Sequence, residues 1–166
     1  MTRQEITQFY REHHGRLYNI ALRILRDPAE AEEAMQDTIL KYVSAGRSFD
    51  SPAQVSAWLA RTCIHDAIDR LRKRRRREAF LEDYAQEQAD GTAPDLPEES
   101  VLSVERIRGA MDSLQEPYRL VLDLVLIEGL DYAEISALTG KKEPTLRSLY
   151  SRGRAQLIEL LNRHEK

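Results

Sequence analysis

The sequence predicts an all-α fold: two small helical domains joined by a flexible acidic linker, the C-terminal domain containing a helix-turn-helix. Of the 166 residues, 42% are hydrophobic and 32% are charged, which suits packed cores under a charged surface. Only seven Gly and six Pro occur, and Val, Ile and Thr form no sustained period-two runs, so helices are favoured over a sandwich or barrel. Residues 79–100 lose apolar periodicity, which divides the chain into domains over 1–78 and 101–166.

Several functional classes are disfavoured by what the sequence lacks. No apolar run approaches the roughly 18 residues that span a bilayer, and the N-terminus has no apolar region of a secretory signal. The single Cys63 and four scattered His give no internal disulfide and no metal pattern. There is no Gly-rich phosphate loop and no Ser or Cys nucleophile with a base. We therefore expect a cytoplasmic protein that is not an enzyme and that takes no cofactor, metal or small-molecule substrate.

Two helices are predicted at the N-terminus. Apolar residues at spacings of three and four predict a first helix over about 2–25. Asp27 can cap a second helix with Pro28 at its first position, and this helix is expected to end at Tyr42 or Val43. Its polar positions form an acidic and amide face, which consists of Glu32, Glu33, Gln36 and Asp37. Because most such faces are simply solvated, periodicity locates this face without giving it a role.

A loop and a long basic helix follow. Residues 44–54 contain Gly, Pro, Ser and Asp without periodicity, which predicts a loop with an exposed Phe49. The third helix is expected to start near residues 51–52, to bury Trp58 in the core and to run into six consecutive cations over 72–77. One or two cations would suffice to complement the dipole of a helix end, so six indicate a further role.

The net charge of −3 hides an asymmetric distribution of charge. Residues 61–78 hold eight Arg or Lys against three acids, whereas residues 79–100 hold seven acids and no base. The clustered cations favour a polyanion, which we interpret as nucleic acid. The acidic stretch contains Gly91, Pro94 and Pro97 and is interpreted as a solubilising linker, with competition against DNA for the basic helix as the second interpretation.

The C-terminal half begins with two predicted helices that supply apolar surface. The first covers about 101–114, with apolar residues at helical spacing. The second is strongly apolar and runs from about 117 to 127 after the break at Glu116-Pro117. Gly129 is the expected C-terminal cap of this second helix.

The last two predicted helices form a helix-turn-helix. Asp131 starts a short helix, a turn follows at Thr139 and Gly140, and a longer helix begins near Glu143. In this motif the N-terminal side chains of the second helix enter the major groove. Side chains of suitable chemistry there are Thr145, Arg147, Ser148, Arg152 and Arg154. The sequence therefore predicts a DNA-reading helix at the C-terminus.

Three segments, in order, resemble those of a small bacterial sigma factor of the extracytoplasmic-function group. The family's acidic helix resembles the segment DPAEAEEAMQDTILKYV of this chain. The family's next helix, which we call the W-L helix after its Trp-Leu pair, resembles the segment AWLARTCIHDAIDRLRKRRRR. The family's promoter-reading domain is similar to LQEPYRLVLDLVLIEGLDYAEISALTGKKEPTLRSLYSRGRAQL. The resemblance covers nearly the whole chain. It implies a promoter-specificity subunit that binds core RNA polymerase, recognises the minus-ten and minus-thirty-five promoter elements and helps to melt the minus-ten region.

The resemblance also implies a role for each surface. The residues that would dock on core RNA polymerase are Glu32, Glu33, Gln36 and Asp37, and an acidic helix suits a basic partner surface. The loop that would hold a base flipped from the minus-ten element consists of Arg47, Ser48, Phe49 and Asp50. The helix residues that would contact DNA at that element are Arg61, His65, Arg70, Arg72, Lys73 and Arg74. The residues that would contact the minus-thirty-five element are Lys142, Thr145, Arg147, Ser148, Arg152 and Arg154.

The remaining implications concern partners and departures from the family. Its members usually work under an anti-sigma factor, often membrane-bound, which would hold the chain at the inner membrane. His65 stands where the family usually has Asn, Lys142 where its recognition helix has a Ser cap, and Leu149 where it commonly has a cation. The alternative hypothesis is a stand-alone helix-turn-helix regulator, which would explain residues 131–163 but not the acidic helix or the W-L segment. The N-terminal half therefore discriminates between the two.

Overall fold

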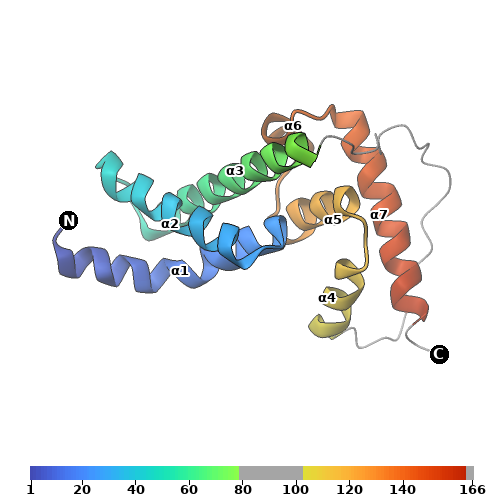
Figure 1. Ribbon diagram of the computed structural model, residues 1–166, viewed down its shortest axis with the longest axis horizontal. Coiled ribbons are helices and arrows are strands. Elements are labelled where there is room, and N and C mark those ends of the chain that lie inside the picture. Colours follow the sequence, from blue (N-terminus) through green and yellow to red (C-terminus); the bar gives the residue numbers. More distant parts are fainter. Residues whose placement is uncertain (79–102, 164–166) are drawn as a thin grey trace. The chain divides into compact units, whose positions relative to one another are not determined.

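The chain is built from helices in two separate units. The computed structural model describes residues 1–78 and 103–163. Every regular element in these ranges is a helix (Figure 1), which confirms the predicted all-α fold. The chain divides into the compact units Met1–Leu81 and Glu82–Lys166. The predicted linker, residues 79–100, lies outside the described residues.

Local sequence signals set the ends of the first two helices. α1 (Arg3–Leu25) starts at a capping box formed by Thr2 and the first turn. α2 (Pro28–Ala45) starts at Asp27, whose carboxylate accepts a hydrogen bond from a backbone N–H of the first turn. Gly46, with a φ of 60°, adopts the left-handed conformation and ends α2. The last residue of the helix, Ala45, lies two to three residues beyond the predicted end. Both predicted helices are thus confirmed.

The first unit is a bundle of three helices. α3 (Pro52–Glu78) packs against both α1 and α2. The start of α1, the end of α2 and the start of α3 lie at one end of this unit (Figure 1). The core contains both small and large apolar side chains, among them Leu17, Ile20, Ala31, Ala34, Leu59, Ile64, Ala67 and Ile68. Small buried side chains such as alanine allow neighbouring helices to pack closely.

Within residues 103–163, the second unit contains five helical segments. They are α4 (Val104–Asp112), α5 (Glu116–Leu122), the π-helical turn η2 (Asp123–Ile127), α6 (Tyr132–Thr139) and α7 (Glu143–Arg163). The long helix α7 packs against α4, α5 and α6 and is the central helix of this unit. The core side chains that it contributes are Leu146, Leu149, Leu157, Ile158 and Leu161.

The predicted helix over 117–127 differs from the observed one in its last turn. The N–H of Glu128 donates to the carbonyl of Asp123 across 3.0 Å, an i to i+5 bond that defines a π turn. Such a turn takes in one extra residue and rotates the side chains that follow it. Ile127, the last residue of this turn, is 54% exposed despite its place in an apolar run. Gly129, with a φ of 71°, then redirects the chain, as expected of a residue after a helix.

Gly153 marks the point where α7 crosses α5. A Cβ there would lie 3.1 Å from Tyr118 Cβ and 3.2 Å from Leu122 Cδ1, and both side chains are buried. We expect Gly153→Ala to lower the free energy of unfolding by about 1–3 kcal/mol, because overpacking exceeds the gain in helix propensity. Gly109→Ala in α4, where a Cβ meets open space, should instead raise it by about 0.5–1 kcal/mol. Urea unfolding compares the two, and a stabilised Gly153→Ala protein would contradict this packing.

Candidate protein and nucleic-acid interfaces

The predicted docking residues lie along one side of α2. Glu32, Glu33 and Gln36 are exposed and Asp37 is half-buried. The Gln36 amide donates to Glu32 Oε1 across 3.3 Å. The opposite side of α2 is buried and consists of Ala31, Ala34, Met35, Thr38 and Ile39. The four polar residues therefore form one continuous stripe, which we call the acidic face.

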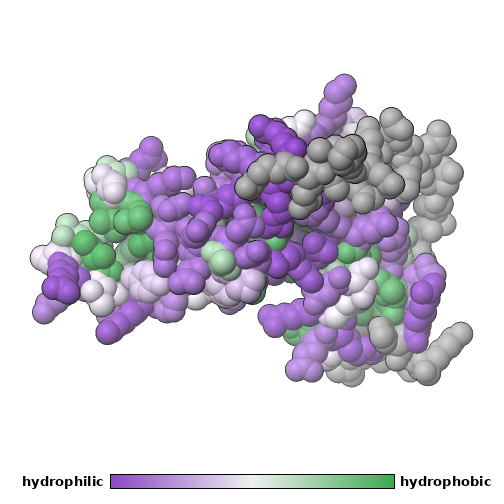
Figure 2. All heavy atoms as spheres, viewed as in Figure 1, coloured by the Kyte–Doolittle hydropathy of each residue, from purple (hydrophilic) through white to green (hydrophobic). Residues whose placement is uncertain are grey.

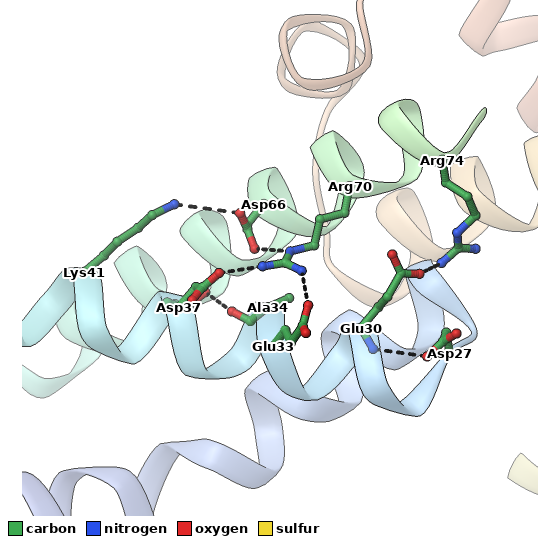
Figure 3. A network of polar contacts seen from close by, with 10 residues as sticks. Asp27, Glu30, Glu33, Ala34, Asp37, Lys41, Asp66, Arg70 and Arg74 are labelled. Carbon is green, nitrogen blue, oxygen red and sulfur yellow. Dashed lines mark hydrogen bonds and ion pairs between the residues drawn. The ribbon is translucent and has the colours of Figure 1, made fainter. Parts of the chain in front are cut away.

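Arg70 of α3 contacts two members of the acidic face (Figure 3). Its Nη1 donates to Glu33 Oε2 across 2.9 Å and its Nη2 to Asp37 Oδ2 across 2.5 Å, while Nε donates to Asp66 Oδ2 across 2.9 Å. Burial disfavours the charged guanidinium, but the hydrogen bonds to Asp66 and Glu33 prevail and raise the pKa of Arg70. Lys41 Nζ lies 3.8 Å from Asp66 Oδ1. We call these five residues the Arg70 cluster.

Arg74, one turn further along α3, contacts the start of α2. One guanidinium nitrogen binds the Glu30 carboxylate, and Nη1 donates to the Leu25 carbonyl across 2.9 Å. The sequence predicts contacts between DNA and both Arg70 and Arg74, and this stays a prediction. In the structure both guanidinium groups lie against carboxylates of α2 (Figure 3).

The other basic residues of α3 lie on a different side of this helix. The exposed ones are Arg61, His65, Arg72, Lys73 and Arg76. Separations of four, seven and four residues place all of these except Lys73 on one stripe of an α-helix, which we call the basic stripe. Lys73 lies beside the stripe and pairs with Asp69, with 3.2 Å between Nζ and Oδ2. Its hydrogen bond to Asp69 lowers the pKa of that carboxyl.

The loop between α2 and α3 packs on an aromatic cluster. The ring of Phe49 stacks on Tyr42, with 6.0 Å between centroids, and tilts against Trp58 at 6.2 Å. Tyr42 in turn stacks on Phe9 at 4.5 Å. The Arg47 guanidinium lies 5.9 Å above the Trp58 ring. Stacked rings and a cation over an indole thus hold the loop against α2 and α3.

Two predictions made from the sequence are wrong at this loop. Phe49 is half-buried where the sequence predicts exposure, and Trp58 is half-buried where it predicts a core residue. Each ring shields the other, and the cluster lies at the end of the three-helix bundle rather than at its centre. Ser48 and Asp50 are exposed on either side of Phe49, and the Asp50 N–H donates to Gln54 Oε1 across 2.9 Å.

The helices α6 and α7 form the predicted helix-turn-helix. Asp131 caps α6 through a capping box. Gly140, with a φ of 77°, ends this helix in the left-handed conformation. The Ser136 hydroxyl donates to the Lys141 carbonyl across 2.6 Å, which fixes the turn before α7. The signals that predicted this motif are therefore the ones that form it.

The predicted DNA-contacting residues lie at Lys142, just before α7, and from the first turn of α7 to just past its middle. Lys142 and Arg147 are exposed, and the half-buried members are Thr145, Ser148, Arg152 and Arg154. The Arg147 guanidinium lies 5.4 Å from the centre of the Tyr132 ring. Its Nη2 lies 3.7 Å from Glu143 Oε1. Tyr132 of α6 and Glu143 of α7 thus both contact Arg147.

The described surface is rich in charged side chains. In the ranges 1–78 and 103–163, no group of three His, Cys, Asp or Glu side chains could hold a metal ion. None of the helices described there is long and apolar enough to cross a membrane. Hydrophilic side chains cover most of the face shown in Figure 2. The arrangement suits binding of one partner to the acidic face and of a polyanion to the basic stripe.

Comparison with known proteins connects these surfaces to a family. A family model described as sigma-70 region 2 matches residues 9–77, and one described as sigma-70 region 4 matches residues 104–157. The ECF RNA polymerase sigma factor SigE of Mycolicibacterium smegmatis is 33% identical over 160 residues, which are 95% of this chain and 62% of SigE. The ECF RNA polymerase sigma factor SigM of Mycobacterium tuberculosis is 32% identical over 159 residues, 96% of this chain and 78% of SigM.

A solved structure agrees with the fold. The sigma factor RpoE of Bartonella quintana, in complex with the anti-sigma factor NepR, has a TM-score of 0.55 and 24% sequence identity and covers 96% of this chain and 98% of its own. At that identity the likeness concerns the fold alone. The two sigma-70 models, in the order region 2 and region 4, fall on the α1–α3 unit and the α4–α7 unit. The chain belongs to the extracytoplasmic-function (ECF) sigma factors of RNA polymerase.

Proposed function

We propose that the chain binds core RNA polymerase through its acidic face and brings two DNA-contacting surfaces to the promoter. Sigma factors of this family direct promoter recognition and are not enzymes. The observation that carries the proposal is the presence, in one small unit, of an acidic face on α2 and a basic stripe on α3. A stand-alone regulator needs only the α6–α7 motif, whereas a polymerase subunit needs a surface for each partner.

The minus-ten element is assigned to the basic stripe and to the loop around Phe49. The stripe presents cations that suit phosphates, which position a protein on DNA without specifying the sequence. Arg47, Ser48 and Asp50 surround the half-buried Phe49 and supply polar groups for an extruded base. Extruding a base costs a few kcal/mol, and a preformed aromatic cluster reduces the further cost of ordering the loop. This loop is therefore the proposed place where the minus-ten region starts to melt.

The minus-thirty-five element is assigned to the exposed side of α7. Arg147 is exposed and its guanidinium lies against Tyr132, so this group can donate two hydrogen bonds to the acceptors of a guanine in the major groove. The neighbouring hydroxyls of Thr145 and Ser148 suit base edges or phosphates. Lys142, before the helix, and Arg152 and Arg154, further along it, are assigned to the DNA backbone.

An anti-sigma factor is the proposed regulator. The resemblance implies such a partner, often membrane-bound, which would keep an otherwise cytoplasmic chain at the inner membrane. The Bartonella quintana sigma factor of similar fold is in complex with the anti-sigma factor NepR. On this chain an anti-sigma factor would have to cover the acidic face, the basic stripe or α7, since any one of these is needed for transcription.

Run-off transcription tests the proposed function directly. Purified chain and core polymerase free of other sigma factors are incubated with a library of genomic fragments from the source organism. We expect specific transcripts that share two upstream elements, and co-elution of the chain with core polymerase. Binding of the chain to DNA without polymerase, together with no transcript and no co-elution, would favour the stand-alone regulator.

A further inference from the structure

We propose that Arg70 is a positioning residue for polymerase docking: it holds Glu33 and Asp37 in the orientation in which they meet the polymerase. The inference rests on the proposed docking role of the acidic face. It assigns to a residue of α3, on another helix, a contribution to a surface formed by α2. The argument follows from the way Arg70 divides its hydrogen bonds among three carboxylates.

Arg70 occupies only one oxygen of each docking carboxylate. It binds Oε2 of Glu33 and Oδ2 of Asp37. The side chains of Glu33 and Asp37 are 67% and 48% exposed, whereas that of Arg70 is 21% exposed. Oε1 and Oδ1 are therefore left to accept hydrogen bonds from a basic partner. Docking can proceed with Arg70 in place.

The cluster stays negative after Arg70 has been counted. Three carboxylates, those of Glu33, Asp37 and Asp66, face the two cations Arg70 and Lys41. Without Arg70 the three anions repel one another, and Lys41 approaches only Asp66 in the structure, at 3.8 Å. The carboxylates of α2 would then sample several rotamers. Fixing them again on binding costs free energy that a preorganised surface avoids.

The shape of the guanidinium explains why this position holds Arg. Its Nε, Nη1 and Nη2 each meet a different carboxylate. A lysine ammonium is a compact charge on a flexible stem and lacks this planar fork. Arg70→Lys therefore keeps the charge but cannot keep three carboxylates in one arrangement.

The same geometry separates Arg70 from the basic stripe. Its three nitrogens each donate to a carboxylate, and two of these carboxylates belong to α2. A phosphate contact through the same N–H groups would require Arg70 to leave charge-assisted hydrogen bonds, which are among the strongest in proteins. The positioning role needs no such rearrangement.

The test measures the affinity of the full-length chain for core RNA polymerase in five variants and the wild type. They are Arg70→Lys, the pair Glu33→Gln with Asp37→Asn, the triple combination of these changes, Asp66→Asn, and the control Arg163→Lys. Arg163 is an exposed arginine paired with Glu159 across 2.5 Å on α7, outside every proposed interface. We expect about tenfold weaker binding for Arg70→Lys, still weaker binding for the pair, and wild-type binding for the control.

The triple variant provides the decisive comparison. If Arg70 acts through Glu33 and Asp37, adding Arg70→Lys to the pair should weaken binding no further. A loss that adds fully to that of the pair would overturn the positioning role. Asp66→Asn serves as a second probe, because it removes one anchor of Arg70 without changing the acidic face. We expect it to weaken binding a few-fold, and wild-type binding of both Asp66→Asn and Arg70→Lys would overturn the inference.

Failure of this inference is distinguishable from failure of the proposed function. Wild-type affinity of the Glu33→Gln, Asp37→Asn pair would contradict docking through the acidic face itself. A weakened pair combined with wild-type affinity of Arg70→Lys would leave docking intact and overturn only the positioning role. The salt dependence of promoter binding by the reconstituted holoenzyme completes the test. Here the variant is Arg70→Gln, which removes the charge. We expect an unchanged slope, and a slope reduced by about one would place Arg70 on a phosphate instead.

Discussion

Reversing two charges of the acidic face, Glu33→Lys with Asp37→Lys, should lower the affinity of the chain for core RNA polymerase by at least about 100-fold. Loss of one partner from a close charge pair typically costs 2–5 kcal/mol, and about 2.7 kcal/mol corresponds to 100-fold. The double change removes two anions and adds two cations beside Arg70, so it disrupts both the docking surface and the contacts that order it. Titration of labelled core polymerase with each purified chain measures the effect.

Controls separate a lost interface from a lost fold. Glu12→Lys reverses one exposed charge on α1, away from the acidic face, and should bind core polymerase as the wild type does. Glu32→Lys with Gln36→Lys changes the two members of the face that make no contact with Arg70. We expect this pair to weaken binding by about tenfold or more with an unchanged melting temperature, since both side chains are exposed. Wild-type affinity of the second pair would argue against docking through α2.

The starts of α2 and α6 and the end of α6 followed from the sequence because local chemistry sets them. Asp27 and Asp131 accept hydrogen bonds from N–H groups of the turn that follows, and Gly140 adopts a left-handed conformation at a helix end. Neither effect requires knowledge of the tertiary structure. The end of α2 at Gly46 lies beyond the predicted one. The π turn after Leu122 is different, because its i to i+5 bonds leave the apolar pattern almost unchanged.

The contacts that organise the candidate interfaces followed from the sequence only in part. Asp66 and Arg70 are four residues apart on one helix, so their pairing could be predicted. The partners of Arg70 on α2 lie 33 and 37 residues away, and their proximity depends on how α2 and α3 pack. Charge counting located the basic segment of α3. It could not separate the exposed stripe from Arg70 and Arg74, because that distinction depends on which side of α3 faces α2.

Replacement of Arg147 by Ala should remove most of the preference of the holoenzyme for promoters with an intact minus-thirty-five element. A bidentate contact between Arg and guanine contributes about 1–3 kcal/mol of discrimination, or about 5- to 150-fold in affinity. Arg147 is suited to this contact, because it is exposed on the first half of α7 and held by Tyr132 and Glu143. A guanidinium held in this way loses less rotamer freedom when it meets the base.

The measurement is a competition between two promoters that differ only in the minus-thirty-five element, one intact and one scrambled. Wild-type holoenzyme should prefer the intact promoter, Arg147→Ala should bind both nearly equally, and Arg163→Ala at the far end of α7 should keep the wild-type preference. Tyr132→Leu should lie between wild type and Arg147→Ala, since it keeps the cation but removes the ring beneath it. If Arg147→Ala weakens binding to both promoters by the same factor, Arg147 contacts the phosphate backbone. The choice between base and backbone thus depends on whether the loss follows the DNA sequence, because a phosphate is the same in every sequence and a base edge is not.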